Sequence, residues 1–318
     1  MENSRVNWFQ KYPKTAAVFL FGATLILLLV GIEYSLQKIM GLGNPVIYQT
    51  NPFYGYRPLP NQEVTRFYGA KLKFNNLGLR ANENWDENVE DKILFLGDSI
   101  TYGGSYIAND QLFSHLALEG IEGYMAGNAG VNGWGVENIH GLVVEAEFLP
   151  AKIYITMLIE GDFYRDRGRL LGLPFWSRKP RWALEEIFFH YITLLSWSRY
   201  RGPDGISVYP EVLEKFLEKS VMRLKEMDEF IKSKGYIHKI YIAADARHLF
   251  HNKSKDAKIL KLLKKHQVDV EYLIDRLKPL KIDPSQSEII FYDGGHLNPE
   301  GHKLWAKLIN DDLKRLLN

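Results

Sequence analysis

From residue 92 onward, short apolar runs alternate with longer amphipathic segments, and this alternation limits the fold more than any other feature of the chain. The run at residues 93–96 is continuous, apolar and closed by glycine, which is typical of a strand buried on both faces. Strands separated by helices predict a mainly parallel sheet that helices cover on both sides. We therefore expect an α/β fold, a three-layer α/β/α sandwich, over residues 89–318.

The elements of this sandwich are predicted from periodicity and end signals. Strands are expected at residues 93–96, 124–128, 152–159, 237–244 and 288–292. Helices are expected at residues 112–118, 136–147, 210–234, 254–278 and 299–317. Residues 33–88 are predicted to be a connector and an N-terminal extension that packs on the domain, with a strand or hairpin near residues 64–74. Six aromatic side chains of this extension need burial: Phe53, Tyr54, Tyr56, Phe67, Tyr68 and Phe74.

The N-terminal region contains one long apolar run. Residues 15–31 carry no charge and Ile32 extends the run, which is long enough to cross a bilayer. Basic residues are denser before the run than after it, so residues 1–14 are predicted to stay in the cytoplasm and the domain to lie outside, in the periplasm or beyond. We favour a single-pass transmembrane anchor at residues 15–32 over a cleaved signal peptide, because the run is long and no Ala-x-Ala-like site follows it. A buried core helix would show a polar face, which the run lacks.

Composition excludes several classes of protein. The chain is 46% apolar and 25% charged, as expected of a globular domain with a sizeable core. A net charge of +2 gives no indication of nucleic acid as a partner. The absence of cysteine excludes disulfides and thiolate zinc sites.

Two short motifs, far apart in the chain, together carry a nucleophile, a base and an orienting carboxylate. Ser99 lies in the sequence GDSI at residues 97–100, directly after the first expected strand. Asp293 precedes His296 by three residues, after the last expected strand. Because loops at the carboxyl ends of parallel strands share one edge of the sheet, we expect these side chains to meet. The alternatives are that Ser99 caps a helix N-terminus and that His296 caps the closing helix.

These motifs, with two further ones, resemble the SGNH (GDSL-type) hydrolase superfamily in its membrane-anchored bacterial branch. Residues 97–100 match the nucleophile block, and residues 128–133 (NAGVNG) resemble the second block. Residues 159–162 (IEGD) lie where the third block normally reads Gly-x-Asn-Asp, and residues 293–296 match the acid–base block. The resemblance extends from about residue 92 to 308, with a long unmatched insertion.

The resemblance implies a role for each matched residue. Ser99 would attack an ester carbonyl, His296 would act as general base and Asp293 would orient the imidazole. Backbone N–H groups of Ser99 and Gly133 would bind the oxyanion. No metal or other cofactor is implied. Asp98, like the aspartate of the third block, Asp162, is expected to bind backbone N–H groups in its loop.

The third block departs from the family pattern. Gly161 stands where the family supplies an asparagine side chain to the oxyanion, and losing such a donor costs about 100- to 1,000-fold in turnover. A replacement donor is expected from the Gly161 backbone, from Asn132 or from a partner protein. The neighbouring Glu160 is expected to point away from the oxyanion, or to pair with Arg165 or Arg167.

Residues 163–205 form an insertion rich in basic and aromatic residues. It is interpreted as a helix near residues 181–200 that covers the core, with its basic ends in solvent. The alternatives are a lid, a glycan-binding face or a surface for anionic lipid headgroups.

In the loop after the fourth strand, Arg247 and His248 are either substrate contacts or part of a solvated loop, and the solvated loop is favoured.

The sequence as a whole predicts a membrane-anchored serine esterase that acts on acyl esters through an acyl-serine intermediate. Its expected substrates are O-acyl groups of cell-envelope carbohydrate or lipid. The first alternative is an O-acyltransferase on an exported polysaccharide, because anchored members of the family resemble proteins that work beside a multi-span membrane acyltransferase. The second alternative is a non-catalytic glycan-binding or assembly module, which the departure at Gly161 favours.

Overall fold

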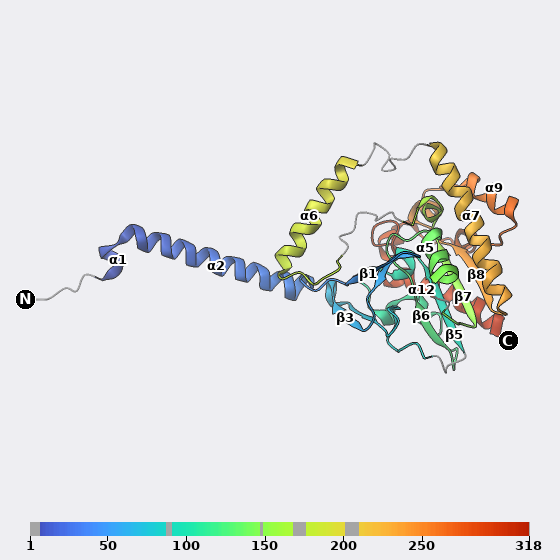
Figure 1. The fold of residues 1–318 in the computed structure, drawn as a ribbon, viewed down its shortest axis with the longest axis horizontal. Helices are drawn as coiled ribbons and strands as arrows, with labels where there is room; N and C mark the ends of the chain where they lie inside the picture. The colour runs from blue at the N-terminus through green and yellow to red at the C-terminus, as the bar shows by residue number, and fades with distance from the viewer. Residues whose placement is uncertain (1–6, 87–90, 147–148, 168–175, 201–209, 318) are drawn as a thin grey trace, which may run out of the picture.

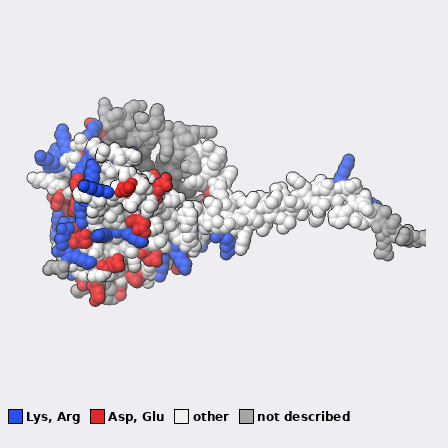
Figure 2. All heavy atoms as spheres, turned by 180° about the vertical axis from the view of Figure 1, so that it is seen from behind, with Lys and Arg blue, Asp and Glu red and all other residues white. Residues whose placement is uncertain are grey.

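A computed structural model of the chain describes residues 7–86, 91–146, 149–167, 176–200 and 210–317. One long helix projects from an α/β domain (Figure 1). This helix, α2 (Pro13–Met40), follows the short α1 (Trp8–Lys11) and is long and apolar enough to cross a membrane, a test that a signal sequence also passes. Charged side chains lie over the domain and are nearly absent along α2 (Figure 2). The helix continues past the apolar run and ends at Gly41, whose φ of 65° is left-handed.

Two hairpins join α2 to the domain. They are formed by β1 (Tyr48–Asn51) with β2 (Gly55–Pro58), and by β3 (Gln62–Thr65) with β4 (Lys71–Phe74). The second hairpin is the one predicted near residues 64–74. Of the six aromatic side chains expected to be buried, Tyr54, Tyr56 and Phe74 are buried and Phe67 is half-buried. The expectation is wrong for Phe53 and Tyr68, which are exposed because they lie at turns.

A five-stranded parallel sheet forms the centre of the domain, which confirms the predicted α/β class. Its order is β6-β5-β7-β8-β9, and all neighbouring pairs are parallel. The strands are β5 (Lys92–Gly97), β6 (Met125–Asn128), β7 (Ile153–Leu158), β8 (Ile237–Ile242) and β9 (Glu271–Tyr272). All residues of the central β5 and β7 are buried, as expected of strands covered on both faces.

Helices cover both faces of the sheet. On one face Phe95 of β5 contacts Phe113 of α4 (Phe113–Leu116), which packs against the closing helix α12 (Pro299–Leu317). On the other face Nδ1 of His238 on β8 donates to Oδ1 of Asp228 on α7 (Pro210–Ser233), at 2.9 Å. The remaining helices and helical turns of the described domain are α3 (Ser99–Tyr102), η2 (Asn109–Gln111), α5 (Val136–His140), η3 (Gly141–Ala146), η4 (Glu160–Tyr164), α8 (Ala246–Phe250), α9 (Ala257–His266), α10 (Leu273–Leu277), η5 (Lys278–Leu280), η6 (Pro284–Gln286) and α11 (Ser287–Ile290).

Two predicted elements are wrong. The helix expected over residues 254–278 is divided into α9, strand β9 and α10, because Gln267 adopts a left-handed conformation that ends α9. The strand expected at residues 288–292 is instead the short helix α11 followed by an isolated bridge between Phe291 and Leu297. Phe291 is buried against Trp305 of α12, so its apolar character reflects helix packing and not a place in the sheet.

The insertion also differs from its favoured interpretation. Its helix, α6 (Ala183–Tyr200), forms near the expected residues, but it contacts α2 and leaves most of its described side chains exposed. It projects beside the domain (Figure 1) and does not cover the core.

Candidate active site

The loops at the carboxyl ends of four neighbouring strands bring the candidate residues to one edge of the sheet. Ser99 follows β5, Gly133 follows β6, Gly161 follows β7 and Asp245 follows β8. The loop that carries Asp293 and His296 joins them from between α11 and α12. It is tied to the β8 loop by a hydrogen bond from the Ala246 N–H to the Gly294 carbonyl, 2.9 Å. Residues far apart in sequence therefore meet at one edge of the sheet, although the acid–base loop follows a helix and not a strand.

The turn before Ser99 depends on a glycine and on an aspartate. A Cβ atom at Gly97 would lie 2.4 Å from the Met157 carbonyl oxygen, so no larger residue fits without movement of the backbone. Asp98 is the N-cap of α3, and its side chain accepts from the N–H of Ile100 at 2.9 Å. The capping role considered for Ser99 thus belongs to its neighbour, and the Ser99 hydroxyl is left available for another partner.

A continuous chain of hydrogen bonds joins Ser99, His296 and Asp293. Nε2 of His296 lies 2.8 Å from Oγ of Ser99, and its Nδ1 lies 2.7 Å from Oδ2 of Asp293. The other carboxylate oxygen of Asp293 accepts from the N–H groups of Gly295 and His296, at 3.1 and 2.9 Å. These contacts give a serine hydroxyl, an imidazole and a carboxylate the geometry of a nucleophile, base and orienter.

The carboxyl group of Asp293 is stabilised in its charged form. Burial opposes its ionisation, but hydrogen bonds from the His296 backbone and imidazole lower its pKa below the ordinary value. A carboxylate that remains charged holds Nδ1 of His296 in the protonated tautomer and leaves Nε2 free to accept a proton from Ser99. The His296 side chain is 38% exposed, so the site is open to a ligand.

The backbone on both sides of Gly133 is held in place by contacts with the N-terminal extension. The Tyr56 hydroxyl donates to the Asn132 carbonyl at 2.6 Å, and Nε1 of Trp134 donates to the Tyr56 carbonyl at 2.8 Å. Gly133 has a φ of 80°, which favours glycine. The extension thus fixes the loop from which an oxyanion donor is expected.

Glu160 points away from the site, and its partners differ from the arginines considered in the sequence. It accepts from the Asp256 N–H at 2.6 Å, and it lies 3.2 Å from Nζ of Lys253 and 3.3 Å from Nε2 of His248. The pairing with Arg165 or Arg167 is therefore wrong. Burial raises the pKa of Glu160, but these hydrogen bonds outweigh it and leave the pKa below the ordinary value.

The two residues singled out in the β8 loop have structural partners. His248 is buried and lies 2.7 Å from Asp245, and these contacts with Asp245 and Glu160 raise its pKa. Arg247 is largely exposed and pairs with Asp245 at 2.7 Å. In the described part of the chain, neither side chain is hydrogen-bonded to Ser99, His296 or Asp293.

Arg165 is a site residue whose place the sequence alone did not reveal. Its Nη1 donates to Oδ2 of Asp98 at 3.1 Å and to the Trp134 carbonyl at 2.8 Å, and it also contacts Asp162. The same Oδ2 of Asp98 accepts from the Ser99 hydroxyl at 3.4 Å. Asp162 also accepts from the Ile159 N–H at 2.9 Å, as expected of a loop-binding aspartate. The position of Arg165 directly after η4, four residues beyond Gly161, is the signal that could have found it.

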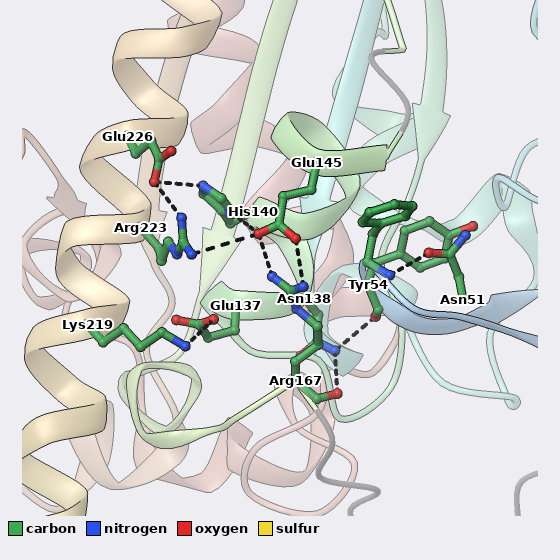
Figure 3. Close-up of polar contacts among 11 residues, drawn as sticks. Asn51, Tyr54, Glu137, Asn138, His140, Glu145, Arg167, Lys219, Arg223 and Glu226 are labelled. Carbon is green, nitrogen blue, oxygen red and sulfur yellow. Dashed lines mark hydrogen bonds and ion pairs between the residues drawn. The ribbon is translucent and has the colours of Figure 1, made fainter.

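A polar network holds the backbone at Arg167, two residues after Arg165 (Figure 3). Arg167 forms a bidentate pair with Glu145, with both distances 2.7 Å. Asn138 donates to the carbonyl oxygens of Tyr54 and Arg167, at 3.0 and 3.1 Å, and accepts from the Gly135 N–H at 3.0 Å. The network joins α5, η3 and the extension to the residues that follow η4.

A groove of about 580 Å³ adjoins the acid–base loop. Its wall includes Tyr106 and Tyr292, whose rings stack with centroids 4.0 Å apart, and the exposed Tyr68. The Tyr106 hydroxyl donates to the Leu297 carbonyl at 3.2 Å, next to His296 in sequence. Among the described residues, no group of three or more His, Asp or Glu side chains is arranged to hold a metal ion.

No family model matches the chain, and no curated protein matches it. Solved structures that are similar to it include a member of the lipolytic protein G-D-S-L family from Veillonella parvula DSM 2008, at 16% identity and a TM-score of 0.37, covering 68% of this chain and 94% of that one. An acetyl xylan esterase is similar at 17% identity and a TM-score of 0.40, covering 68% of this chain and 96% of that one. Another, from the rumen bacterium Butyrivibrio proteoclasticus, is similar at 15% identity and a TM-score of 0.38, covering 74% of this chain and 66% of that one. The first of these three is named for the G-D-S-L family, which is the family that the motifs of this chain resemble.

Proposed function

We propose that this protein is a serine-dependent hydrolase of acyl esters, of the SGNH type. The observation that carries the proposal is the hydrogen-bonded chain from Ser99 through His296 to Asp293, with distances of 2.8 and 2.7 Å. The three residues come from two motifs almost two hundred residues apart, and a merely structural role does not require this geometry. The assembled chain also argues against a non-catalytic module.

The reaction proceeds through an acyl-serine intermediate. Oγ of Ser99 bonds to the ester carbonyl carbon while its proton passes to Nε2 of His296. The tetrahedral intermediate then breaks its bond to the alcohol oxygen, and His296 returns the proton to the leaving alcohol. Water attacks the acyl-serine by the same route and releases a carboxylic acid. Asp293 stabilises the imidazolium in both halves, and the N–H groups of Ser99 and Gly133 stabilise the oxyanion.

The proposed substrate is an O-acylated carbohydrate or lipid of the cell envelope. The groove that adjoins the acid–base loop supports the carbohydrate, because stacked and exposed tyrosine rings offer flat apolar faces together with polar hydroxyl groups. Helix α2 supports a location at the membrane, with residues 1–14 in the cytoplasm and the domain outside.

Transfer of the acyl group to a polysaccharide is the second candidate, and the anchor favours it. Hydrolysis and transfer share the acyl-serine and differ only in whether water or a sugar hydroxyl accepts the acyl group. A multi-span membrane acyltransferase would be the partner that supplies the acyl group.

The proposal is tested with a fluorophosphonate probe and p-nitrophenyl acetate. Wild-type protein should be labelled and should release p-nitrophenol in water, whereas Ser99→Ala should do neither. Ser285→Ala, a matched change at an exposed serine, should behave as wild type. Unlabelled but folded wild-type protein would rule out both enzyme functions. Acetyl groups that appear on an added oligosaccharide, in place of free acetate, would assign transfer.

A further inference from the structure

We propose that the Arg165 guanidinium supplies the side-chain donor to the oxyanion that Gly161 lacks. This inference rests on the proposed hydrolase function and identifies a residue of the same site. A Cβ atom at Gly161 would lie 3.7 Å from Nη2 of Arg165 and 3.6 Å from Cδ1 of Ile159, so this nitrogen lies beside the position that a side chain at residue 161 would take. The guanidinium of Arg165, directly after η4, thus lies next to the place of the missing asparagine.

The guanidinium is held at the junction of three loops of the site. Nη1 binds Asp98 of the nucleophile loop, the Trp134 carbonyl beside Gly133, and Asp162 of the loop after β7. In the described part of the chain, all hydrogen bonds of Arg165 run through Nη1, which leaves the N–H groups of Nη2 for a ligand. Asp98 links the guanidinium to the nucleophile, because one of its oxygens contacts both Nη1 and the Ser99 hydroxyl.

The surroundings of Arg165 suit a donor that must not move during the reaction. Its side chain is only 16% exposed, and the bidentate pair of Arg167 with Glu145 fixes the neighbouring backbone (Figure 3). Burial and the nearby charge of Asp98 raise the pKa of Asp162, which reduces the negative charge that would oppose an oxyanion. A fixed charged donor in a site partly screened from water stabilises an oxyanion strongly.

The test removes the proposed donor at Arg165 and then introduces an asparagine donor at position 161. Arg165→Met should lower kcat for p-nitrophenyl acetate by about 100-fold, with little change in KM. Gly161→Asn in the Arg165→Met background should recover about 10-fold or more, because ordinary van der Waals space surrounds the Cβ position. Arg315→Met, a matched change at an exposed arginine paired with Asp312 on α12, should leave kcat unchanged.

The opposite results would contradict either the role of Arg165 or the hydrolase function itself. Full activity in Arg165→Met would overturn the assignment of Arg165. A loss of kcat that Gly161→Asn does not recover, in a folded protein by circular dichroism, would make Arg165 a structural support and also overturn it. Full activity in Ser99→Ala would instead refute the hydrolase itself.

A second inference concerns α6 and follows from different observations. We infer that α6 lies on the outer surface of the membrane beside α2, with a lipid bilayer as the partner of its apolar side chains. The inference rests on the proposed anchor. Helix α6 runs away from α2 at a steep angle. Over most of its length no other described element lies against it (Figure 1).

The start of α6 is fixed at the level where the apolar run of α2 ends. Glu33, the first residue after the run, accepts from the N–H groups of Ala183 and Leu184 at 2.5 and 3.0 Å. Glu186, in the first turn of α6, pairs with buried Arg66 at 2.5 Å and so ties the helix to the extension. A helix that starts at this level and runs away from α2 would lie along the bilayer surface.

The exposed residues of α6 have the composition of an interfacial helix. Phe188 is 62% exposed and Ile192 is 46% exposed, whereas the ring of Phe189 between them contacts Trp176, with centroids 5.4 Å apart. The exposed large apolar and aromatic side chains of this region are Trp182, Leu184, Ile187, Phe188, Phe189, Tyr191, Ile192 and Leu195. Exposed bases precede them at Arg178, Lys179 and Arg181. Aromatic and aliphatic side chains with flanking bases are typical of helices that lie in the headgroup region, and basic groups favour anionic lipids.

The absence of cysteine makes the test direct. Single cysteines are placed at Ile192 on α6, Leu28 on α2 and Lys261 on α9, labelled with an environment-sensitive fluorophore, and the full chain is reconstituted in vesicles with spin-labelled lipid. The probes at Leu28 and Ile192 should be quenched, and the probe at Lys261 should not. Quenching at Leu28 without quenching at Ile192 would overturn the inference and favour a protein partner for α6. No quenching at Leu28 would refute the anchor and the inference together.

Discussion

The Ser99 hydroxyl is available as a nucleophile because its neighbour performs the capping. Asp98 satisfies the N–H of Ile100, and Gly97 allows the chain to turn close to β7. The hydroxyl therefore faces His296, with which it forms a 2.8 Å hydrogen bond. The reactive group and the helix cap therefore occupy adjacent residues, with His296 as the nearest partner of the hydroxyl and the Ile100 N–H as the partner of the cap.

Asp293 determines which nitrogen of His296 carries the proton. In Asp293→Asn, the amide can donate to Nδ1 and would leave Nε2 protonated, which is the wrong tautomer for a base. We expect kcat for p-nitrophenyl acetate to fall by about 10,000-fold. Because the Asp293 side chain is 49% exposed, the melting temperature should change little. Activity within tenfold of wild type would show that Asp293 is not the orienter.

The lowered pKa of Asp293 also predicts how activity depends on pH. The carboxylate stays charged as the pH falls through the ordinary value of about 3.9, so its protonation should not limit kcat at pH 5. A ¹³C NMR titration of the Asp293 carboxyl group in the folded protein tests this. Its midpoint should lie below the ordinary value of about 3.9, and a midpoint at or above that value would contradict the prediction.

At the scale of elements, the contact of α12 with α4 contains a buried histidine. His302 is fully buried, accepts from the Phe113 N–H at 3.1 Å and stacks on the Phe113 ring. Burial and the charge of Arg80 lower the pKa of His302 to about 3.

The neutral state of His302 predicts a loss of stability in acid. Between its ordinary pKa of about 6.5 and its folded value of about 3, only the unfolded chain binds the proton, so stability falls as the pH falls through this window. The contribution is up to about 1.4 kcal/mol per pH unit. His302→Asn keeps an acceptor for Phe113 and should lose stability less steeply between pH 6.5 and pH 4.5. Denaturant unfolding at several pH values measures this, with the exposed His251→Asn as control; equal slopes for His302→Asn and wild type would contradict it.

At the scale of the whole molecule, the chain consists of a domain with a charged surface and the apolar helix α2, which projects from it (Figure 2). We expect the full chain to stay with membranes after alkaline carbonate extraction. The double change Leu25→Lys with Leu28→Lys should release it, since each base at the centre of a span costs about 2.5–3.5 kcal/mol. Lys258→Leu with Lys261→Leu on α9 is the matched control and should remain bound. A soluble form shortened at its N-terminus would instead identify a cleaved signal sequence.

Much of the molecule is determined locally, and the sequence by itself predicts that part. The order of strands and helices follows from apolar periodicity, and the nucleophile and acid–base motifs identify Ser99, Asp293 and His296. Local periodicity predicted the wrong element in two places. Residues 288–292 were expected to form a strand, but Phe291 is apolar because it packs on α12. The helix expected over residues 254–278 is interrupted because α9 ends at a left-handed residue, Gln267. These differences depend on what lies opposite each side chain, which no local pattern contains.

Only the tertiary structure decided how the site is completed and where the insertion lies. The separation of Arg165 from Gly161 along the chain is short, yet its place beside Asp98 and Trp134 depends on three loops meeting at one sheet edge. The pairing of Glu160 with Lys253 and His248, and of Glu33 with the start of α6, likewise joins segments that are distant in sequence. Local propensity sets which elements form, whereas long-range contacts are set by the packing of complete elements. The sequence therefore determined the fold class and the three motif residues, and the packing decided which further groups surround them.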